Sequence, residues 1–186
     1  MKHLTSLLNL SVDDVHTILS KSHELKACWK RGERPTLLQG RYLTQVFEKP
    51  SLRTRVSFDA AMAQLGGTGN FLSGADVGLA TGRESLADIA RVLSGYSDAV
   101  VLRTFSQKLI EDFASFSRCP VINGLSDDDH PCQALTDLFT IQENFGKLDV
   151  RIVDDIKLAD TVLDVGYTFA WDYPFALRHQ NTTTVL

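Results

Sequence analysis

Apolar residues recur at helical spacing in several segments of the chain, and short apolar runs typical of strands lie between them. Helices are expected over residues 11–32, 56–65, 84–95, 106–116 and 131–145, and strands over residues 42–47, 70–72, 98–102 and 120–123. Ser11 followed by Asp14, Ser106 and Pro131 are typical of helix starts, and Gly66-Gly67 and Gly146 of helix ends. Because strands alternate with helices, the pattern predicts an α/β fold with a mostly parallel sheet flanked by helices.

One of these segments carries a further prediction about burial. The run Ala99-Val100-Val101-Leu102 is apolar throughout, as expected of a strand buried on both faces. The first helix is predicted from the near-helical spacing of its apolar residues, which are Val12, Val15, Ile18, Leu19, Leu25 and Trp29.

The pattern changes after Leu148. Asp154-Asp155 interrupts an apolar run, and aromatic residues at alternate positions from Tyr167 to Phe175 fit one face of a strand. We therefore expect one domain over residues 1–148, followed by an atypical or truncated tail over residues 149–186.

Composition narrows the class of protein. The chain has 186 residues and a formal net charge of −4, so it has no basic footprint for nucleic acid. Its three cysteines cannot form a complete disulfide set and show no zinc spacing, which favours the reducing cytoplasm. No apolar run is long enough to span a membrane.

The segment Ser51-Leu52-Arg53-Thr54-Arg55 lies between a predicted strand and a predicted helix. The start of a helix offers backbone N–H groups and the positive end of its dipole, which together bind anions. The two arginines are two positions apart, so one can serve a ligand and the other the structure. The alternative is a solvated, basic first turn.

Arg103 follows the apolar run 99–102, where ligands of open α/β sheets bind outside the carboxyl ends of the strands. The alternative is a salt bridge at the edge of the sheet. Asp127-Asp128-Asp129 is interpreted as a solvated turn, because three consecutive acids seldom converge on one metal ion.

His130-Pro131-Cys132-Gln133 also enters a helix. His130 can donate to a carbonyl oxygen, and Gln133 can donate or accept. A histidine that only caps the helix is the alternative, and Cys132 is interpreted as a buried or lining residue.

Polar residues thus gather at strand-to-helix transitions, which lie on one rim of the predicted sheet. The group comprises Ser51, Arg53, Thr54, Arg103, His130 and Gln133. Such residues suit a doubly charged phosphate with a polarised carbonyl beside it.

Two motifs support this interpretation. Phe47-Glu48-Lys49-Pro50-Ser51-Leu52-Arg53-Thr54-Arg55-Val56-Ser57-Phe58, and then His130-Pro131-Cys132-Gln133, resemble the ornithine carbamoyltransferase family. The resemblance extends from about residue 3 to Leu148. Cys132 and the Phe-Glu-Lys-Pro start favour the ornithine branch over the aspartate branch.

The resemblance implies transfer of a carbamoyl group from carbamoyl phosphate to L-ornithine, which gives L-citrulline and phosphate in arginine biosynthesis. It implies that Ser51, the Leu52 backbone, Arg53 and Thr54 hold the phosphate, and that Arg103 bridges phosphate and carbonyl oxygen. His130 would bond the carbonyl oxygen, and Gln133 the carbamoyl nitrogen. The catalytic residues would be Arg53, Arg103, His130 and Gln133. The resemblance also implies that no metal or organic cofactor is required.

The sequence departs from the family pattern at two places. Residues 76–83 contain neither the Gln nor the His that family members lend to a neighbouring subunit, with Thr81 and Arg83 as possible substitutes. The signatures of the family's ornithine-binding domain are absent. The family forms trimers or multiples of trimers, so we expect a homo-oligomer.

Three other functions stay open at this point. The first is a non-catalytic domain that binds carbamoyl phosphate, and the second is a carbamoyltransferase with aspartate or acetylornithine as acceptor. The third is a structural fragment in which the aromatic residues of the tail mediate assembly.

Overall fold

The computed structural model describes residues 2–79, 82 and 84–146. The chain divides into two units, Met1–Pro131 and Cys132–Leu186. The predicted domain boundary at residue 148 and every prediction for residues 149–186 lie outside the described residues.

The predicted α/β fold is confirmed, with strands and helices in alternation. The elements are η1 (Leu7–Asn9), α1 (Val12–Lys30), β1 (Tyr42–Phe47), α2 (Leu52–Gln64), β2 (Thr68–Ser73), α3 (Leu86–Tyr96), β3 (Ala99–Arg103), α4 (Gln107–Phe116), β4 (Val121–Leu125) and α5 (Pro131–Phe145). The four strands form one parallel sheet in the order β2-β1-β3-β4. The chain before α1 lies beside β4, where Leu4 forms an isolated bridge with Ile122.

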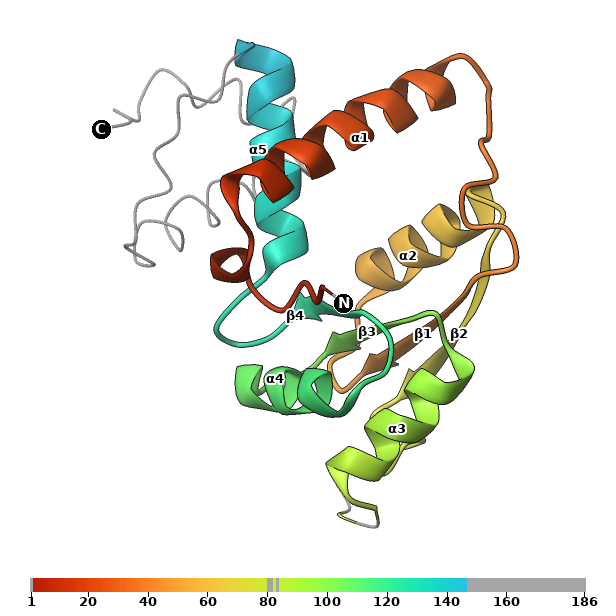
Figure 1. Cartoon of the computed structure of the whole chain (residues 1–186), viewed down its shortest axis with the longest axis vertical. Helices are drawn as coiled ribbons and strands as arrows, with labels where there is room; N and C mark the ends of the chain where they lie inside the picture. Colours follow the sequence, from red (N-terminus) through yellow and green to blue (C-terminus); the bar gives the residue numbers. More distant parts are fainter. Residues whose placement is uncertain (1, 80–81, 83, 147–186) are drawn as a thin grey trace. The chain divides into compact units, whose positions relative to one another are not determined.

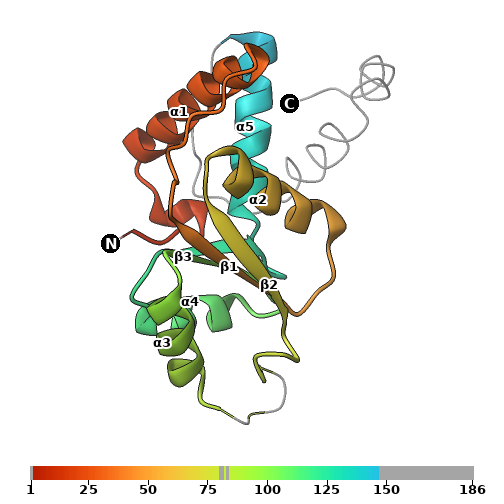
Figure 2. The ribbon, with the colours of Figure 1, turned by 90° about the vertical axis from the view of Figure 1, so that its right-hand side faces the viewer.

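Helices cover both faces of this sheet. Helix α2 lies on one face, and α3 and α4 lie on the other (Figure 1 and Figure 2). Val100, Val101 and Leu102 of β3 are fully buried between the two layers, as their apolar run predicts. Their alternate side chains join both core clusters, since Val101 packs with Leu43 while Val100 and Leu102 pack with Phe113.

Serine side chains begin the helices of the first unit. Ser11, Ser51, Ser85 and Ser106 each accept a hydrogen bond from a backbone N–H in the first turn of the helix that follows. Helix α2 therefore begins at Leu52, four residues before the helical spacing of apolar residues predicts. Leu52 is 79% exposed, so its side chain does not belong to the core. The periodicity of apolar residues therefore does not indicate where this helix starts.

The apolar side of α1 is only partly buried. Val15 and Leu19 are buried, whereas Val12 and Trp29 are 57% and 53% exposed. The helix that this spacing predicts is therefore confirmed, and only part of its apolar side is buried. None of the helices in the described part of the chain is long and apolar enough to cross a membrane.

Candidate functional site

The strand order places a topological switch point between β1 and β3. From β1 the chain crosses to β2 on one side, and from β2 it returns to β3 on the other side of β1. In such sheets, the loops at the carboxyl ends of the two strands diverge and leave room for a ligand. Phe47, which ends β1, pairs with Arg103, which ends β3. The start of α2 at Ser51 and the end of β3 at Arg103 therefore lie on either side of the switch point.

The first turn of α2 combines free hydrogen-bonding capacity with positive charge. Ser51 Oγ accepts from the Thr54 backbone N–H at 3.3 Å and donates to Thr54 Oγ1 at 3.0 Å. No acidic residue lies in this turn. Leu52 and Arg53 are both exposed. This turn can receive an anion through backbone N–H groups, hydroxyls and the helix dipole.

Arg103 reaches this turn from β3. Its Nη1 lies 3.3 Å from Thr54 Oγ1 and 3.4 Å from the Gly124 carbonyl oxygen. The pairing of β3 with β4 shifts register between Leu102 and Arg103, and such a bulge redirects the side chain that follows it. A Cβ on Gly124 would lie 3.0 Å from Val101 Cγ1, so glycine allows β4 to pass close to the Val101 side chain of β3.

His130 is half-buried beside this arginine. Burial, and then the positive charge of Arg103, lower the pKa of His130 to about 4. Its Nδ1 atom is buried and has no hydrogen-bond partner among the residues that the structure describes. A neutral imidazole can donate from one nitrogen at physiological pH, and buried polar atoms normally have partners. Both features fit a histidine whose partner is a ligand.

Gln133 belongs to the second unit, so its position relative to the phosphate-binding residues stays a prediction. Within α5 it donates from Nε2 to Asp137 Oδ1 at 2.9 Å. Burial raises the pKa of Asp137 to about 6, and the hydrogen bond from Gln133 partly opposes this rise. Cys132 is partly buried and is not in a disulfide. Sequence reasoning missed Asp137, although its spacing of four residues from Gln133 is a helical contact distance.

The two arginines of the motif differ in their surroundings. The Arg55 guanidinium lies 4.0 Å from the centroid of the Phe71 ring and 3.8 Å from an Asp59 oxygen. Arg55 therefore supports the packing of α2 against β2, as expected for one member of the pair. The assignment of Arg53 to a ligand stays a prediction.

The prediction of a solvated turn at residues 127–129 is correct for two residues and wrong for the third. Asp127 and Asp128 are exposed, but Asp129 is half-buried. Burial raises the pKa of Asp129, and hydrogen bonds from Ser6 and from backbone groups oppose that rise. The amino-terminal segment that runs beside β4 buries this carboxylate, a contact between residues too distant in sequence to predict. Within residues 2–79, 82 and 84–146, no cluster of three His, Cys, Asp or Glu side chains could hold a metal ion.

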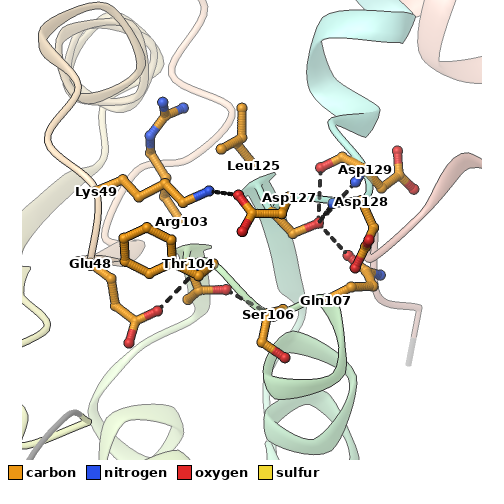
Figure 3. A network of polar contacts seen from close by, with 12 residues as sticks. Glu48, Lys49, Arg103, Thr104, Ser106, Gln107, Leu125, Asp127, Asp128 and Asp129 are labelled. Atoms are coloured by element: carbon orange, nitrogen blue, oxygen red, sulfur yellow. Dashed lines mark hydrogen bonds and ion pairs between the residues drawn. The ribbon is translucent and has the colours of Figure 1, made fainter. Parts of the chain in front are cut away.

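A further network joins the loops around the switch point, and it was not predicted from the sequence. Lys49 forms an ion pair with Asp127, and the backbone N–H of Phe105 donates to Glu48 (Figure 3). The substitutes considered for the lent residue, Thr81 and Arg83, lie outside the described residues. Val77 and Leu79 of that loop pack against the core beneath α3.

A hollow of about 400 Å³ lies at the opposite end of the strands, but no charged group lines it. Its walls are Tyr42, Thr44, Asn70, Leu93, Tyr96 and Ser97. The cationic side chains near the carboxyl ends of β1 and β3 make that end the better candidate for an anionic ligand.

Comparison with known proteins agrees with the geometry. Residues 2–143 match the family model described as the carbamoyl-P binding domain of aspartate/ornithine carbamoyltransferase. The ornithine carbamoyltransferase of Anoxybacillus flavithermus is 50% identical over 147 residues, which cover 79% of this chain and 46% of that protein. The enzyme of the same name from Methanopyrus kandleri is 42% identical over 179 residues, covering 94% of this chain and 57% of that one.

Solved structures give the same result. The ornithine carbamoyltransferase of Pyrococcus furiosus superposes with a TM-score of 0.76 at 46% identity and covers 78% of this chain and 46% of its own. The catalytic subunit of the M. jannaschii aspartate transcarbamoylase superposes with a TM-score of 0.72 at 35% identity, over 79% of this chain and 48% of its own. The chain thus spans about half the length of most of these relatives. The family match, the parallel sheet and the basic turn beside Arg103 agree: the chain belongs to the aspartate/ornithine carbamoyltransferase family and carries its carbamoyl-phosphate-binding domain.

Proposed function

We propose that this chain binds carbamoyl phosphate and acts as the carbamoyl-phosphate half of an ornithine carbamoyltransferase. The reaction transfers the carbamoyl group to the δ-amine of L-ornithine and gives L-citrulline and phosphate. Support for the acceptor comes from relatives named ornithine carbamoyltransferase at up to 50% identity. The similarity to an aspartate transcarbamoylase makes aspartate the second candidate acceptor.

The phosphate group would bind at the start of α2. Ser51 and Thr54 supply hydroxyls, the backbone at Leu52 supplies an N–H group, and Arg53 supplies positive charge. The dipole of α2 adds a favourable electrostatic potential for an anion at the same point. No acidic residue in the first turn cancels this potential. Charge-assisted hydrogen bonds of this kind are about twice as strong as neutral ones.

The carbonyl oxygen would lie between Arg103 and His130. When an amine attacks the carbonyl carbon, negative charge develops on this oxygen before the bond to phosphate breaks. Donors already fixed in position stabilise that charge without reorganisation, and loss of one such donor typically costs ~10²–10³ in rate. The low pKa of His130 keeps its imidazole neutral, so it serves as a hydrogen-bond donor rather than an acid. Gln133 would orient the carbamoyl nitrogen, a role that rests on the family resemblance.

One observation carries this proposal, the 3.3 Å contact of Arg103 with Thr54. It joins the end of β3 to the anion-binding turn, so that one guanidinium can touch both the phosphate and the carbonyl of a single small ligand. The reaction needs orientation and charge stabilisation, which these residues provide without a covalent intermediate.

Two further aspects follow from the family and the thiols. We infer a homo-oligomer, a trimer or a multiple of trimers, in which neighbouring subunits complete the site. None of Cys28, Cys119 and Cys132, all within the described residues, is in a disulfide, which fits the reducing environment of the cytoplasm.

The test is citrulline formation by the purified chain with carbamoyl phosphate and a panel of acceptors. Ornithine, aspartate and acetylornithine are supplied in turn, and carbamoyl phosphate binding is measured in parallel. Turnover with ornithine supports the full proposal, and turnover with another acceptor reassigns the branch. Binding without turnover on any acceptor limits the chain to a carbamoyl-phosphate-binding role. Absence of binding overturns the proposal.

A further inference from the structure

Three loops meet above the carboxyl ends of β1, β3 and β4, and each carries or precedes a residue of the proposed site. The loop after β1 leads from Lys49 to Ser51, the loop after β3 leads from Arg103 to Phe105, and the loop after β4 leads from Asp127 to His130. The mutual spacing of these loops therefore sets the spacing of the groups that would hold phosphate and carbonyl.

Phe105 is the point where the three loops are joined. Its backbone N–H donates to Glu48 Oε2 at 3.2 Å, and its carbonyl oxygen accepts from the Asp127 backbone N–H at 2.9 Å. The Lys49 ammonium lies 4.6 Å from the centroid of its ring and forms an ion pair with the Asp127 carboxylate. Lys49, Phe105 and Asp127 thus form a closed cycle of contacts, here called the loop clasp. Figure 3 shows the ion pair between Lys49 and Asp127.

The two charged groups of the loop clasp differ in their exposure to solvent. The Lys49 side chain is 18% exposed and that of Asp127 is 61% exposed, so the lysine is covered while its partner faces solvent. An exposed ion pair usually contributes little to stability, because water competes for both charges. The contact of a covered ammonium with an aromatic face is more stable, because the cation–π interaction is stronger when the cation is partly desolvated.

We propose that Lys49 and Asp127 are positioning residues, whose pairing across Phe105 holds the phosphate-binding turn at a fixed distance from Arg103 and His130. This inference rests on the proposed function of the site. Neither residue touches the ligand. They act through the loops, so a ligand that spans the turn and His130 depends on the loop clasp more than a ligand that occupies the turn alone.

A competing role for Lys49 is direct attraction of the phosphate, with Asp127 drawing the lysine away. The variant Asp127→Asn separates the two roles, because they predict effects of opposite sign. It adds one net positive charge near the site, so direct attraction predicts tighter binding of carbamoyl phosphate. Loss of the loop clasp predicts weaker binding despite the added charge.

The experiment measures dissociation constants of the full chain for carbamoyl phosphate and for inorganic phosphate by calorimetry. The variants are Lys49→Met, Asp127→Asn and the double variant. We expect each single variant to weaken carbamoyl phosphate about tenfold and the double variant to be no weaker than either, since all three lose the same pairing. Inorganic phosphate should weaken about twofold or less in Asp127→Asn.

Controls separate this effect from general destabilisation. Lys49→Arg keeps a cation over the ring and should bind carbamoyl phosphate within about threefold of the unmodified chain. Lys108→Met removes the exposed ion pair with Asp112 on α4 and should change neither constant. Melting temperatures identify any variant that is not folded, and Lys49→Arg then supplies the folded comparison.

The outcomes distinguish this inference from the proposed function. Unchanged or tighter carbamoyl phosphate binding by Asp127→Asn overturns the positioning role while leaving the site itself intact. A double variant that loses the product of the two single effects also overturns it, because the residues then act independently. If the unmodified chain binds no carbamoyl phosphate, the proposed function fails first.

Discussion

Helices α1 and α2 begin with the same serine cap but treat the positive end of the helix dipole in opposite ways. In α1 the residue three positions after Ser11 is Asp14, whose carboxylate accepts from Ser11 Oγ at 2.6 Å and from the Ser11 backbone N–H at 2.9 Å. In α2 the residue three positions after Ser51 is Thr54, which forms a hydroxyl pair with Ser51 and accepts from Arg103. One start supplies its own anion, and the other is surrounded by donors and positive charge.

The difference shows how a common structural device becomes a binding device. A capping box satisfies backbone N–H groups internally, and the hydrogen bonds of Asp14 with Lys2 and Ser11 hold the pKa of its carboxyl well below its usual range. Replacement of that acid by a hydroxyl residue leaves the N–H groups and the dipole for an external anion. The start of α4 also lacks an acid, so the cap alone is not enough. What distinguishes α2 is Arg103 arriving from β3 at the switch point.

The largest loss of carbamoyl phosphate affinity is expected when α2 receives the acidic capping residue that begins α1. Thr54→Asp creates a capping box with Ser51 and an ion pair with Arg103, so α2 should remain folded. Carbamoyl phosphate affinity should fall more than about 100-fold, since placing like charges together costs several kcal/mol. Calorimetric titration measures the affinity, and circular dichroism verifies the helix. The mirror variant Asp14→Thr should lower the Tm slightly without changing affinity. Equal affinity in Thr54→Asp would remove α2 from the site.

A second comparison lies within α2, between Arg53 and Arg55. Arg53→Ala should weaken carbamoyl phosphate binding about 30-fold, because a hydrogen bond between charged groups contributes about 2 kcal/mol. Arg55→Ala is the matched control, since it removes the same charge two positions along. Its affinity should change less than about threefold, with a loss of roughly 0.5–1 kcal/mol of stability from the Phe71 contact. Equal effects of the two variants would mean that only net charge matters.

The third prediction concerns the carbonyl end of the site, where His130 is held neutral. Its pKa is lowered from 6.5 to about 4 in the folded chain. Between these values the unfolded chain takes up a proton and the folded chain does not, so stability is lost as the pH falls from 6.5 toward 4. Between pH 6.5 and pH 4.5 the unmodified chain should lose about 1–3 kcal/mol more than His130→Gln, at about 1.4 kcal/mol per pKa unit. Urea denaturation at several pH values tests this, and identical pH profiles would contradict it.

Sequence reasoning succeeded where a local rule governs the outcome. The strand over residues 99–102 was predicted because an uninterrupted apolar run is typical of a doubly covered strand, and the structure places it at residues 99–103. The contact between Thr54 and Arg103 followed from the rule for carboxyl ends of parallel strands. Both rules depend on residues close together in the chain or on topology alone.

It failed where burial or pairing comes from distant segments. Lys49 and Asp127 are 78 positions apart in the sequence. No local sequence pattern identifies a lysine and an aspartate at that separation as partners. The half-buried Asp129 depends on the amino-terminal segment beside β4, and the exposed Leu52 hid the start of α2 from apolar periodicity. These are contacts that only the folded sheet brings together.

The most direct test of the account is a calorimetric titration of the 186-residue chain with carbamoyl phosphate, repeated in the presence of inorganic phosphate and with Thr54→Asp. We predict saturable binding to one site per chain, competition by inorganic phosphate, and no detectable binding by Thr54→Asp. Binding that persists in Thr54→Asp, or that inorganic phosphate does not displace, would contradict the placement of the phosphate at the start of α2.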